Sequence, residues 1–323
     1  MNRKAFIATT VATLLALGAG PSLAQDYPAK PVRIMVGASA GGGTDILARM
    51  LADKFRVALK QSFVVENRPG AANTLAADAT AKAPKDGHTL LVATNTGQAI
   101  APHLLKLGYD PLKDLQPICM VVVVPHLVLV GQNEKARDLK ELVAAIKDNP
   151  GKYGYASSGI GSTQHIAGES LNLAAGTKAV HVPYKGSSAA HIDLISGQVQ
   201  FMIDTTSSAM GQVKSGALRP LAVTTAKRLD ELPNVPTVRE LGMPTLEIST
   251  WYGLYVTAGT PPEVVEKLHA ELQRTLKMPD VQERLRGLGG QSEDLTVQQF
   301  TEFNRSEFDR FGKLVKAAHM KAE

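Results

Sequence analysis

Residues 32–49 combine an apolar strand-like run, three consecutive glycines and the beginning of a helix. The run reads VRIMVGASAGGGTDILAR, with glycines at 41, 42 and 43. Glycine lets the backbone turn sharply and lets a ligand reach bare N–H groups, and a helix N-terminus adds unpaired amides and a positive dipole end. The stretch therefore predicts an anion-binding turn with a helix that begins near Thr44 or Asp45. Taken alone, the triplet is more typical of a flexible turn capped by Thr44, and only the context of the rest of the chain favours anion binding.

The first 24 residues have the pattern of a secretory signal. Arg3 and Lys4 precede an apolar run over 5–18, and the small residues Ser22 and Ala24 precede Gln25. This pattern predicts a signal peptide at 1–24 that is cleaved on export. The apolar run is too short to span a bilayer comfortably, and no later stretch approaches the length of a membrane helix.

The mature chain has the length of two ordinary domains and is nearly neutral. Without the signal it carries 33 Lys and Arg against 30 Asp and Glu, a formal charge of +3. Because aromatics are few and like charges form no block, nucleic acid and membrane surfaces are poor partners, whereas a small anion is compatible. Cys119 is the only cysteine, which excludes an internal disulfide and predicts a buried, inert thiol.

Short apolar runs alternate with segments of helical spacing along the mature chain. Continuous apolar runs of this length are typical of strands buried in parallel sheets, so the pattern predicts an α/β fold. We expect strands at 32–36, 63–66, 89–94, 119–124, 127–131, 153–157, 179–182, 199–204, 219–223 and 247–256. We expect helices at 45–60, 75–83, 139–148, 162–175, 188–196, 207–215, 262–276, 280–288 and 297–318.

Two places lack a helix between adjoining apolar runs and are candidate crossovers between domains. One is the double strand around Pro125, and the other is the extended run at 247–256. The resulting prediction is one domain at 25–125 plus 250–323 and a second domain at 126–249, with a ligand cleft at the strand ends between them. We expect His126, beside the first crossover, to be a structural histidine.

A second glycine-containing helix start lies in the expected middle domain. Ser162 follows Gly159 and Gly161 and is a good N-cap. Two amide-rich helix starts that face one cleft would hold the carboxylates of a solute from both sides. A third loop at 181–186 offers the Tyr184 hydroxyl and the Lys185 ammonium at another strand end.

Asp204 ends an apolar strand and has two equally supported readings. Either it caps the helix that begins near Ser207, or it faces the cleft and binds a hydroxyl or ammonium of the ligand. His165 and Glu169 have the spacing of a metal-binding pair, but no third ligand is nearby in the sequence, so no metal site is expected.

The first glycine stretch also fits a competing function, an exported serine hydrolase. Residues 37–41 match Gly-x-Ser-x-Gly around Ser39, and Asp204 and His269 follow in the order of an α/β-hydrolase triad. Such an elbow needs the helix to start directly after the serine, whereas further residues intervene before Thr44. The hydrolase is therefore the alternative to a binding protein.

Several motifs together resemble the Bug family, the solute receptors of tripartite tricarboxylate transporters. They are YPAKPVRI at 27–34, AGGGTD at 40–45, VENRPGA at 65–71, PKDGHTLL at 84–91, YDP at 109–111, HVPYKG at 181–186 and LPNVPT at 232–237. The resemblance covers essentially the whole mature chain. It implies a type II periplasmic binding-protein fold, with two α/β domains around a cleft that closes on a small carboxylated solute. It also implies a monomer that works with membrane permease subunits in the periplasm, without catalysis, cofactor or metal.

The resemblance places ligand contacts in the loops that match 39–45 and 157–165, and the chain departs from the family pattern just before the first of them. Gly37, Ala38 and Ser39 stand where relatives often have a proline and an aromatic residue, so we expect Ala38 to widen the pocket toward a bulkier acid. The complete set of expected ligand-binding residues is Ser39, Ala40, Gly41, Gly42, Gly43, Thr44, Asp45, Thr94, Asn95, Ser157, Ser158, Gly159, Gly161, Ser162, Thr163, His165, Tyr184 and Asp204.

Overall fold

The computed structural model describes residues 27–317 and residue 320, and the expected signal peptide lies outside them. Strands and helices alternate along the described chain, which confirms the α/β prediction. The strands are β1 (Val32–Val36), β2 (Phe63–Asn67), β3 (Thr89–Thr94), β4 (Leu115–Gly131), β5 (Gly154–Ser157), β6 (Val180–Pro183), β7 (Phe201–Thr205), β8 (Leu218–Val223) and β9 (Ser249–Thr257). The helices are α2 (Gly43–Leu59), α3 (Thr74–Ala81), α4 (Leu139–Asp148), α5 (Thr163–Ala175), α6 (Ser187–Ser196), α7 (Thr206–Lys214), α8 (Pro262–Leu276), α9 (Pro279–Gly287) and α10 (Val297–Ala317).

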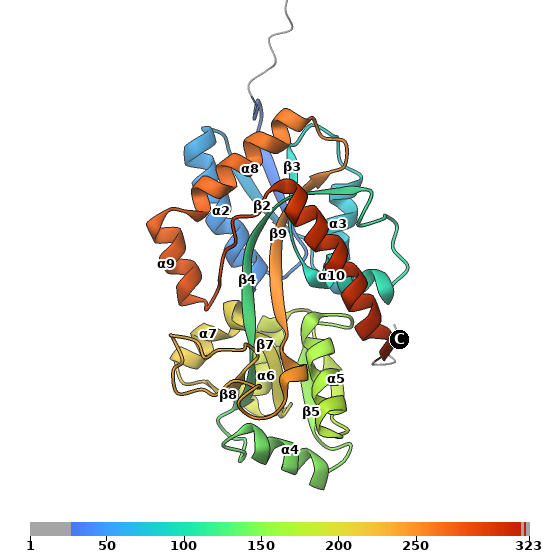
Figure 1. Cartoon of the computed structure of the whole chain (residues 1–323), viewed down its shortest axis with the longest axis vertical. Helices are drawn as coiled ribbons and strands as arrows, with labels where there is room; N and C mark the ends of the chain where they lie inside the picture. The colour runs from blue at the N-terminus through green and yellow to red at the C-terminus, as the bar shows by residue number, and fades with distance from the viewer. Residues whose placement is uncertain (1–26, 318–319, 321–323) are drawn as a thin grey trace, which may run out of the picture.

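The nine strands of the described residues form one sheet with the order β2-β1-β3-β9-β4-β7-β5-β6, and β8 pairs with β4 beside this path. β1 pairs in parallel with β2 and β3, and β5 pairs in parallel with β6 and β7. β4 and β9 run antiparallel to each other and connect two groups of helices, as Figure 1 shows. We call the part with β1–β3, α2, α3 and α8–α10 the first lobe and the part with β5–β8 and α4–α7 the second lobe.

The expectation of two strands around Pro125 is wrong, because β4 continues through it as one strand of 17 residues. β4 pairs with β9 up to Pro125 and with β7 and β8 from His126 onward. Proline has no N–H to donate to a ladder, and here it falls where the strand changes partners. The His126 N–H that follows donates to Thr224 Oγ1 at 2.8 Å.

The helix boundaries agree with the sequence to within about two residues, with two informative differences. α2 begins at Gly43, and its N-cap is Gly42 without a side-chain hydrogen bond, so the expected capping role of Thr44 is wrong. At α5 the expected cap is confirmed, because Ser162 Oγ accepts from His165 N–H. The sequence also missed a π-helical turn at Thr96–Ile100 and the short 3-10 turns at Ala71–Asn73, Ala101–His103 and Pro244–Leu246.

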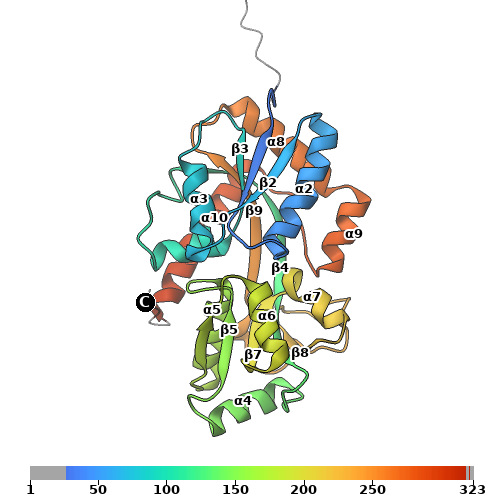
Figure 2. The ribbon, with the colours of Figure 1, turned by 180° about the vertical axis from the view of Figure 1, so that it is seen from behind.

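α10 packs against β4 on the side of the first lobe that faces away from the viewer in Figure 2, where α3 hides much of it. Its buried Phe300 and Phe311 belong to the same apolar cluster as Trp251 and Tyr255 of β9. Trp251 Nε1 donates to Glu307 Oε2 at 3.0 Å, and Tyr255 donates to Asn304 at 2.9 Å. The amphipathic helix α10 thus packs on the buried aromatic residues of β9 and completes this part of the core.

Cys119 is fully buried in β4, which confirms the prediction for this thiol. Burial raises its pKa to about 12, so the thiol stays protonated and unreactive. Within residues 27–317, no helix has both the length and the apolar character that crossing a bilayer requires.

Candidate functional site

A cavity of about 740 Å³ lies between the two lobes. Its walls come from the carboxyl ends of β1, β2, β5 and β6 and from the first turns of α2, α6 and α7, where parallel-sheet proteins place ligands. Among the described residues that line it, Lys185 is the only charged one, and it is exposed. The lining comprises residues 37–39, 42–44, 69–73, 105, 158–160, 183–188, 208 and 252.

The first glycine loop (residues 37–43) connects β1 to α2 and forms one wall. Its amides are less free than the sequence suggests: Gly41 N–H donates to Asp45 Oδ2 at 2.9 Å and Gly42 N–H to Ser39 O at 3.1 Å. Gly43 N–H donates to Ser208 Oγ of the second lobe at 3.3 Å. Among the described residues, the amide of Thr44, directly after this loop, has no protein acceptor, so it is a backbone donor available to a ligand.

Asp45 holds the first glycine loop from inside and does not line the cavity. It is 3% exposed, pairs with Arg49 at 2.9 Å and accepts from Asn67 Nδ2 at 3.0 Å. Burial alone would raise the pKa of this carboxyl, but the donors from Arg49, Gly41 and Asn67 outweigh it and lower the pKa. The carboxylate is therefore a charged brace for the loop.

The second glycine loop (residues 158–162) connects β5 to α5 and forms the facing wall. Protein acceptors take most of its amides: Gly159 N–H donates to Ser157 Oγ, Gly161 N–H to His165 Nδ1 and Ser162 N–H to Gly159 O. The expectation of bare amides is therefore wrong for most of this loop. Because these donors are occupied, the side chains of this loop matter more than its backbone amides for binding a ligand.

Two stacked histidines support the second glycine loop. The rings of His165 and His181 are 3.7 Å apart with an interplanar angle of 6°, and Tyr155 stacks beside them. His181 Nε2 lies 2.6 Å from Ser157 Oγ. Burial lowers the pKa of His165 to about 3, with His181 a further cause, and burial lowers that of His181 to about 4. Both rings are therefore neutral at pH 7, and His165 Nδ1 can accept from Gly161 N–H.

Contacts between the lobes border the cavity. Ser39 Oγ donates to Lys185 O at 2.8 Å, and Thr163 N–H donates to Thr96 Oγ1 at 3.2 Å. A Cβ added at Gly43 would lie 2.3 Å from Ser207 Oγ and 2.9 Å from Tyr252 Oη. The lobes therefore approach so closely at α2 that only glycine fits.

The structure brings seven of the expected ligand-binding residues to the cavity and leaves the others behind it. Those that line it are Ser39, Gly42, Gly43, Thr44, Ser158, Gly159 and Tyr184. Those that do not line it are Ala40, Gly41, Asp45, Thr94, Asn95, Ser157, Gly161, Ser162, Thr163, His165 and Asp204. Most of the second group support the two glycine loops by hydrogen bonds. Ala38 also lines the cavity, where its small side chain leaves space for a ligand.

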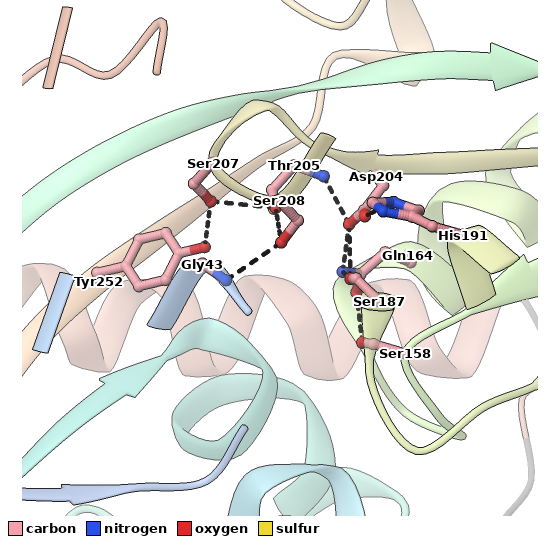
Figure 3. Close-up of polar contacts among 10 residues, drawn as sticks. All are labelled: Gly43, Ser158, Gln164, Ser187, His191, Asp204, Thr205, Ser207, Ser208 and Tyr252. Carbon is pink, nitrogen blue, oxygen red and sulfur yellow. Dashed lines mark hydrogen bonds and ion pairs between the residues drawn. The ribbon is translucent and has the colours of Figure 1, made fainter. Parts of the chain in front are cut away.

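Asp204 is neither the N-cap of a helix nor a residue that faces the cleft. It is fully buried behind the cavity, so it does not face the cleft, and Thr205 rather than Asp204 is the N-cap of α7. Its oxygens accept from Gln164, Ser187, His191 and the Thr205 N–H, as Figure 3 shows. The carboxylate anchors a polar network whose outer members reach the cavity wall.

The hydrolase alternative is wrong in its geometry. The Ser39 hydroxyl donates to Lys185 O, His269 contacts Leu295 O from α8, and the histidine beside Asp204 is His191. α2 begins four residues after Ser39, so its amides are not placed as a nucleophile elbow places them. The three residues of the supposed triad are thus not joined to one another.

The cavity segment at 69–73 was not predicted from the sequence, although the family motif at 65–71 includes part of it. Ala71, Ala72 and Asn73 have φ values of 45°, 51° and 69°, in the left-handed region that side chains rarely adopt. Such backbone strain concentrates at ligand sites. The signal that could have located this wall is the Pro-Gly pair at 69–70, directly after β2 at the same sheet edge as the first glycine loop.

The described residues contain no group of three histidine, cysteine or carboxylate side chains able to hold a metal ion. His165 and Glu169, which have metal-pair spacing, have other partners: His165 accepts from Gly161, and Glu169 accepts from the Tyr155 hydroxyl at 2.6 Å.

Known proteins are similar to this chain in both sequence and architecture. The model of the tripartite tricarboxylate transporter family receptor (TctC) matches residues 47–320. The periplasmic binding protein BugD is 35% identical, with a TM-score of 0.87 over 92% of this chain and 100% of BugD. Rpa4515 from R. palustris, determined with adipate, is 32% identical, with a TM-score of 0.89 over 92% of this chain and 99% of that one.

A third structure is MatC from Rhodopseudomonas palustris with bound malate. It is 31% identical, with a TM-score of 0.85 over 90% of this chain and 100% of MatC. The resemblance to Bug receptors and the expected periplasmic binding-protein fold are therefore confirmed. The chain belongs to the receptor family of the tripartite tricarboxylate transporters.

Proposed function

We propose that this protein captures a small carboxylated solute in the periplasm and delivers it to the permease subunits of a tripartite tricarboxylate-type transporter. The observation that carries the proposal is the cavity between the two glycine loops, whose only charged lining residue in the described chain is Lys185. A cavity with one cation and no carboxylate in its wall favours an anion over a cation.

The relatives support the same class of ligand. Rpa4515 was determined with adipate and MatC with malate, both of which are dicarboxylates. The Thr44 amide, the Ser208 hydroxyl and the Lys185 ammonium are the donors that we assign to the carboxylates here. Ser208 Oγ accepts from Gly43 N–H and Thr205 Oγ1, so its own hydrogen is available to the cavity.

The remaining expected residues act in this proposal by holding the loops. Asp45 and Gly41 hold the first glycine loop, and Ser157, Gly161, Ser162 and His165 hold the second. Thr163 bonds both to Thr96 and to Asn95, so it connects the lobes beside the cavity. The protein binds its solute as a monomer, without chemistry or a cofactor.

The domain division belongs to the same proposal. We assign residues 25–125 and 250–323 to one domain and 126–249 to the other, with hinges near Pro125 and 249–253. The antiparallel pairs Val124↔Thr250 and Pro125↔Ser249 support these hinges, because neighbouring strands at this point could turn together in one rotation. Solution scattering should show compaction when ligand is added, and identical profiles at saturation would argue for a rigid cleft.

Thermal unfolding of the mature protein against a panel of organic acids tests the function. A ligand that binds only the folded state raises the midpoint of unfolding, by an amount that grows with its concentration. We expect at least one di- or tricarboxylate to do so, whereas the matching diol without carboxylates should not. If no acid shifts the midpoint and calorimetry detects no binding, the proposed function is wrong.

A further inference from the structure

A buried cluster of polar side chains joins the two lobes next to β9. We call it the interlobe clasp, and its members are Asn95 and Thr96, which follow β3 in the first lobe, and Thr163, the first residue of α5 in the second lobe. Their exposed fractions are 0%, 4% and 0%. None of the three lines the cavity, so the clasp lies outside the site that a solute would occupy.

The backbone of β9 fixes the direction of the first hydrogen bond between the lobes. The Ser249 carbonyl oxygen can only accept, and Asn95 Nδ2 donates to it at 3.0 Å. Asn95 Oδ1 therefore faces Thr163 Oγ1, also at 3.0 Å. Because an amide oxygen cannot donate, the Thr163 hydroxyl gives its hydrogen to Asn95.

Two further hydrogen bonds join Thr163 to Thr96. Thr163 N–H donates to Thr96 Oγ1 at 3.2 Å, and the two hydroxyl oxygens are 3.1 Å apart. Since Thr163 has given its only hydroxyl hydrogen to Asn95, Thr96 is the donor between the two hydroxyls. Each polar side-chain atom of the clasp thus has a partner inside the protein, and none needs a solute to complete its hydrogen bonds.

The clasp differs from the contacts between the lobes that border the cavity. Ser39 Oγ donates to Lys185 O at an exposed position, and Gly43 N–H donates to Ser208 Oγ at a partly buried one. Water can compete for hydrogen bonds at such positions, whereas it reaches the buried clasp only when the lobes separate. The hydrogen bonds of the clasp therefore depend on the arrangement of the lobes and not on the solute.

We propose that the interlobe clasp favours the closed arrangement of the lobes before a solute binds. It supplies part of the free energy of closing, and the solute supplies the rest. When the arrangement that binds becomes less populated, the apparent affinity falls by the same factor for every ligand of that arrangement. The clasp therefore changes the strength of binding without contacting the solute.

The distance between two nitroxide labels, measured by pulsed electron paramagnetic resonance on the mature protein, reports the arrangement of the lobes. Asp53 on α2 and Ile192 on α6 are exposed, so Asp53→Cys with Ile192→Cys places one label on each lobe. Cys119 is buried and unreactive, so it takes no label. In the ligand-free protein we expect a short distance that matches this structure, together with a longer one from open molecules.

Thr163→Val keeps the shape of the side chain and removes its hydroxyl. In the closed arrangement Asn95 Oδ1 then loses its donor and the Thr96 hydroxyl loses its acceptor, whereas water can pair with both when the lobes are open. We expect the ratio of short to long distances in the ligand-free protein to fall about tenfold. Thr163→Ser keeps the hydroxyl and should keep the wild-type ratio. Thr80→Val, which removes a buried hydroxyl that bonds within α3, is the matched control and should also keep it.

Calorimetry with adipate and malate adds a second readout. The affinity of Thr163→Val for each acid should fall by the same factor, about three- to tenfold, because the solute now has to supply more of the free energy of closing. The ratio of the two affinities should stay at its wild-type value, since Thr163 does not line the cavity. A changed ratio would contradict the inference, because Thr163 would then act on the solute itself.

Two results of the distance measurement would overturn the inference. One is a wild-type protein that shows only the longer distance without solute, and the other is an equal ratio of distances in the wild-type protein and the folded variant. If Thr163→Val does not fold, Thr96→Val replaces it with the same expected outcomes, because it removes the acceptor of Thr163 N–H and the donor to Thr163 Oγ1. The measurement needs no solute, so it decides the inference even if no acid binds and the proposed function is wrong.

Discussion

The two glycine loops border the same cavity, yet different chemistry holds each of them. The first is braced by the charged Asp45–Arg49 pair, and its helix begins on Gly42 and Gly43 without a side-chain cap. The second is capped by Ser162 and supported by neutral His165. A glycine-rich sequence therefore does not predict which groups hold a loop in place, because those groups lie outside the glycines.

The difference predicts unequal responses to acid. Asp45 has a lowered pKa, so its brace stays charged below the ordinary range of a carboxyl. Burial keeps the supporting histidines neutral in the folded protein, whereas in the unfolded chain they take up protons below about pH 6.5. Mild acid should therefore reduce the stability that depends on these histidines before it reduces the stability that depends on Asp45.

The largest effect is expected from Gly43→Ala in the first loop. Its new methyl group would lie 2.3 Å from Ser207 Oγ, so the lobes could not approach as they do here. We expect affinity for the acid identified by thermal unfolding to fall about 100-fold, or about 2.7 kcal/mol, within the range for overfilled packing. Calorimetry measures this directly.

Gly211→Ala is the control for that substitution, because no heavy atom lies within 4 Å of its added Cβ. It should bind like the wild-type protein. Unchanged affinity in Gly43→Ala would mean that the first loop does not meet the second lobe when ligand is bound.

Next in size is the loss of the charged brace in Asp45→Asn. The substitution removes the charge from a carboxyl that is 3% exposed and has three donors. We expect the free energy of unfolding to fall by about 2 kcal/mol. Ser162→Ala in the second loop should cost about 1 kcal/mol, as loss of an N-cap does.

Urea unfolding of both variants makes the comparison between the loops quantitative. Asp53→Asn, at an exposed position on the same helix as Asp45, is the control and should change stability by less than about 0.5 kcal/mol. Equal costs for Asp45→Asn and Ser162→Ala would show that the charged brace has no special role.

The histidine support predicts a pH dependence of stability. The folded-state pKa values of His165 and His181, about 3 and about 4, lie below the ordinary histidine value of 6.5. Their contribution to stability is therefore complete above pH 6.5 and is lost as pH falls toward 4. Each should add a slope of up to about 1.4 kcal/mol per pH unit in this window.

The variant His181→Phe keeps an aromatic ring in the stack but removes one titrating group. Urea unfolding between pH 7 and pH 4.5 should give a shallower slope for this variant than for the wild-type protein. His126, whose pKa burial lowers to about 4, continues to contribute in both proteins. Parallel slopes would mean that the second loop does not depend on a neutral histidine pair.

A smaller effect is expected at Ala38, which lines the cavity beside the first loop. Ala38→Phe should fill space and weaken a bulky acid about fivefold, or about 1 kcal/mol, while small dicarboxylates bind as well or better. Calorimetry with adipate and succinate provides the two sizes. Equal weakening of both, or of neither, would contradict the size argument.

The smallest effect should come from Ala72→Gly, in the cavity segment opposite the second loop. Ala72 has a φ of 51°, which glycine adopts without the steric cost that a Cβ brings. We expect the free energy of unfolding to rise by about 0.5–1 kcal/mol, against the usual direction of an alanine-to-glycine change. A loss of stability in thermal unfolding would show that the conformation is not strained.

The sequence by itself determined the order of strands and helices and the position of both glycine loops. Apolar runs and helical spacing are local properties, so β1, β3, α4 and α8 have the bounds that their patterns predict. The family motifs also predicted the fold, because they are distributed over essentially the whole mature chain.

Only the tertiary structure decided which groups face the cavity and which hold it. Asp204 and His165 have the residue types of ligand contacts, but pairing of β5 with β7 and packing of α5 bury both behind the wall. The histidine stack and the polar contacts of Asp204 join residues from different elements, and Asp45 is held by Asn67 of β2 as well as by its helical neighbour Arg49. Their roles depend on distances and burial that no local pattern encodes, because a hydrogen bond acquires its direction and strength from all the groups that surround it.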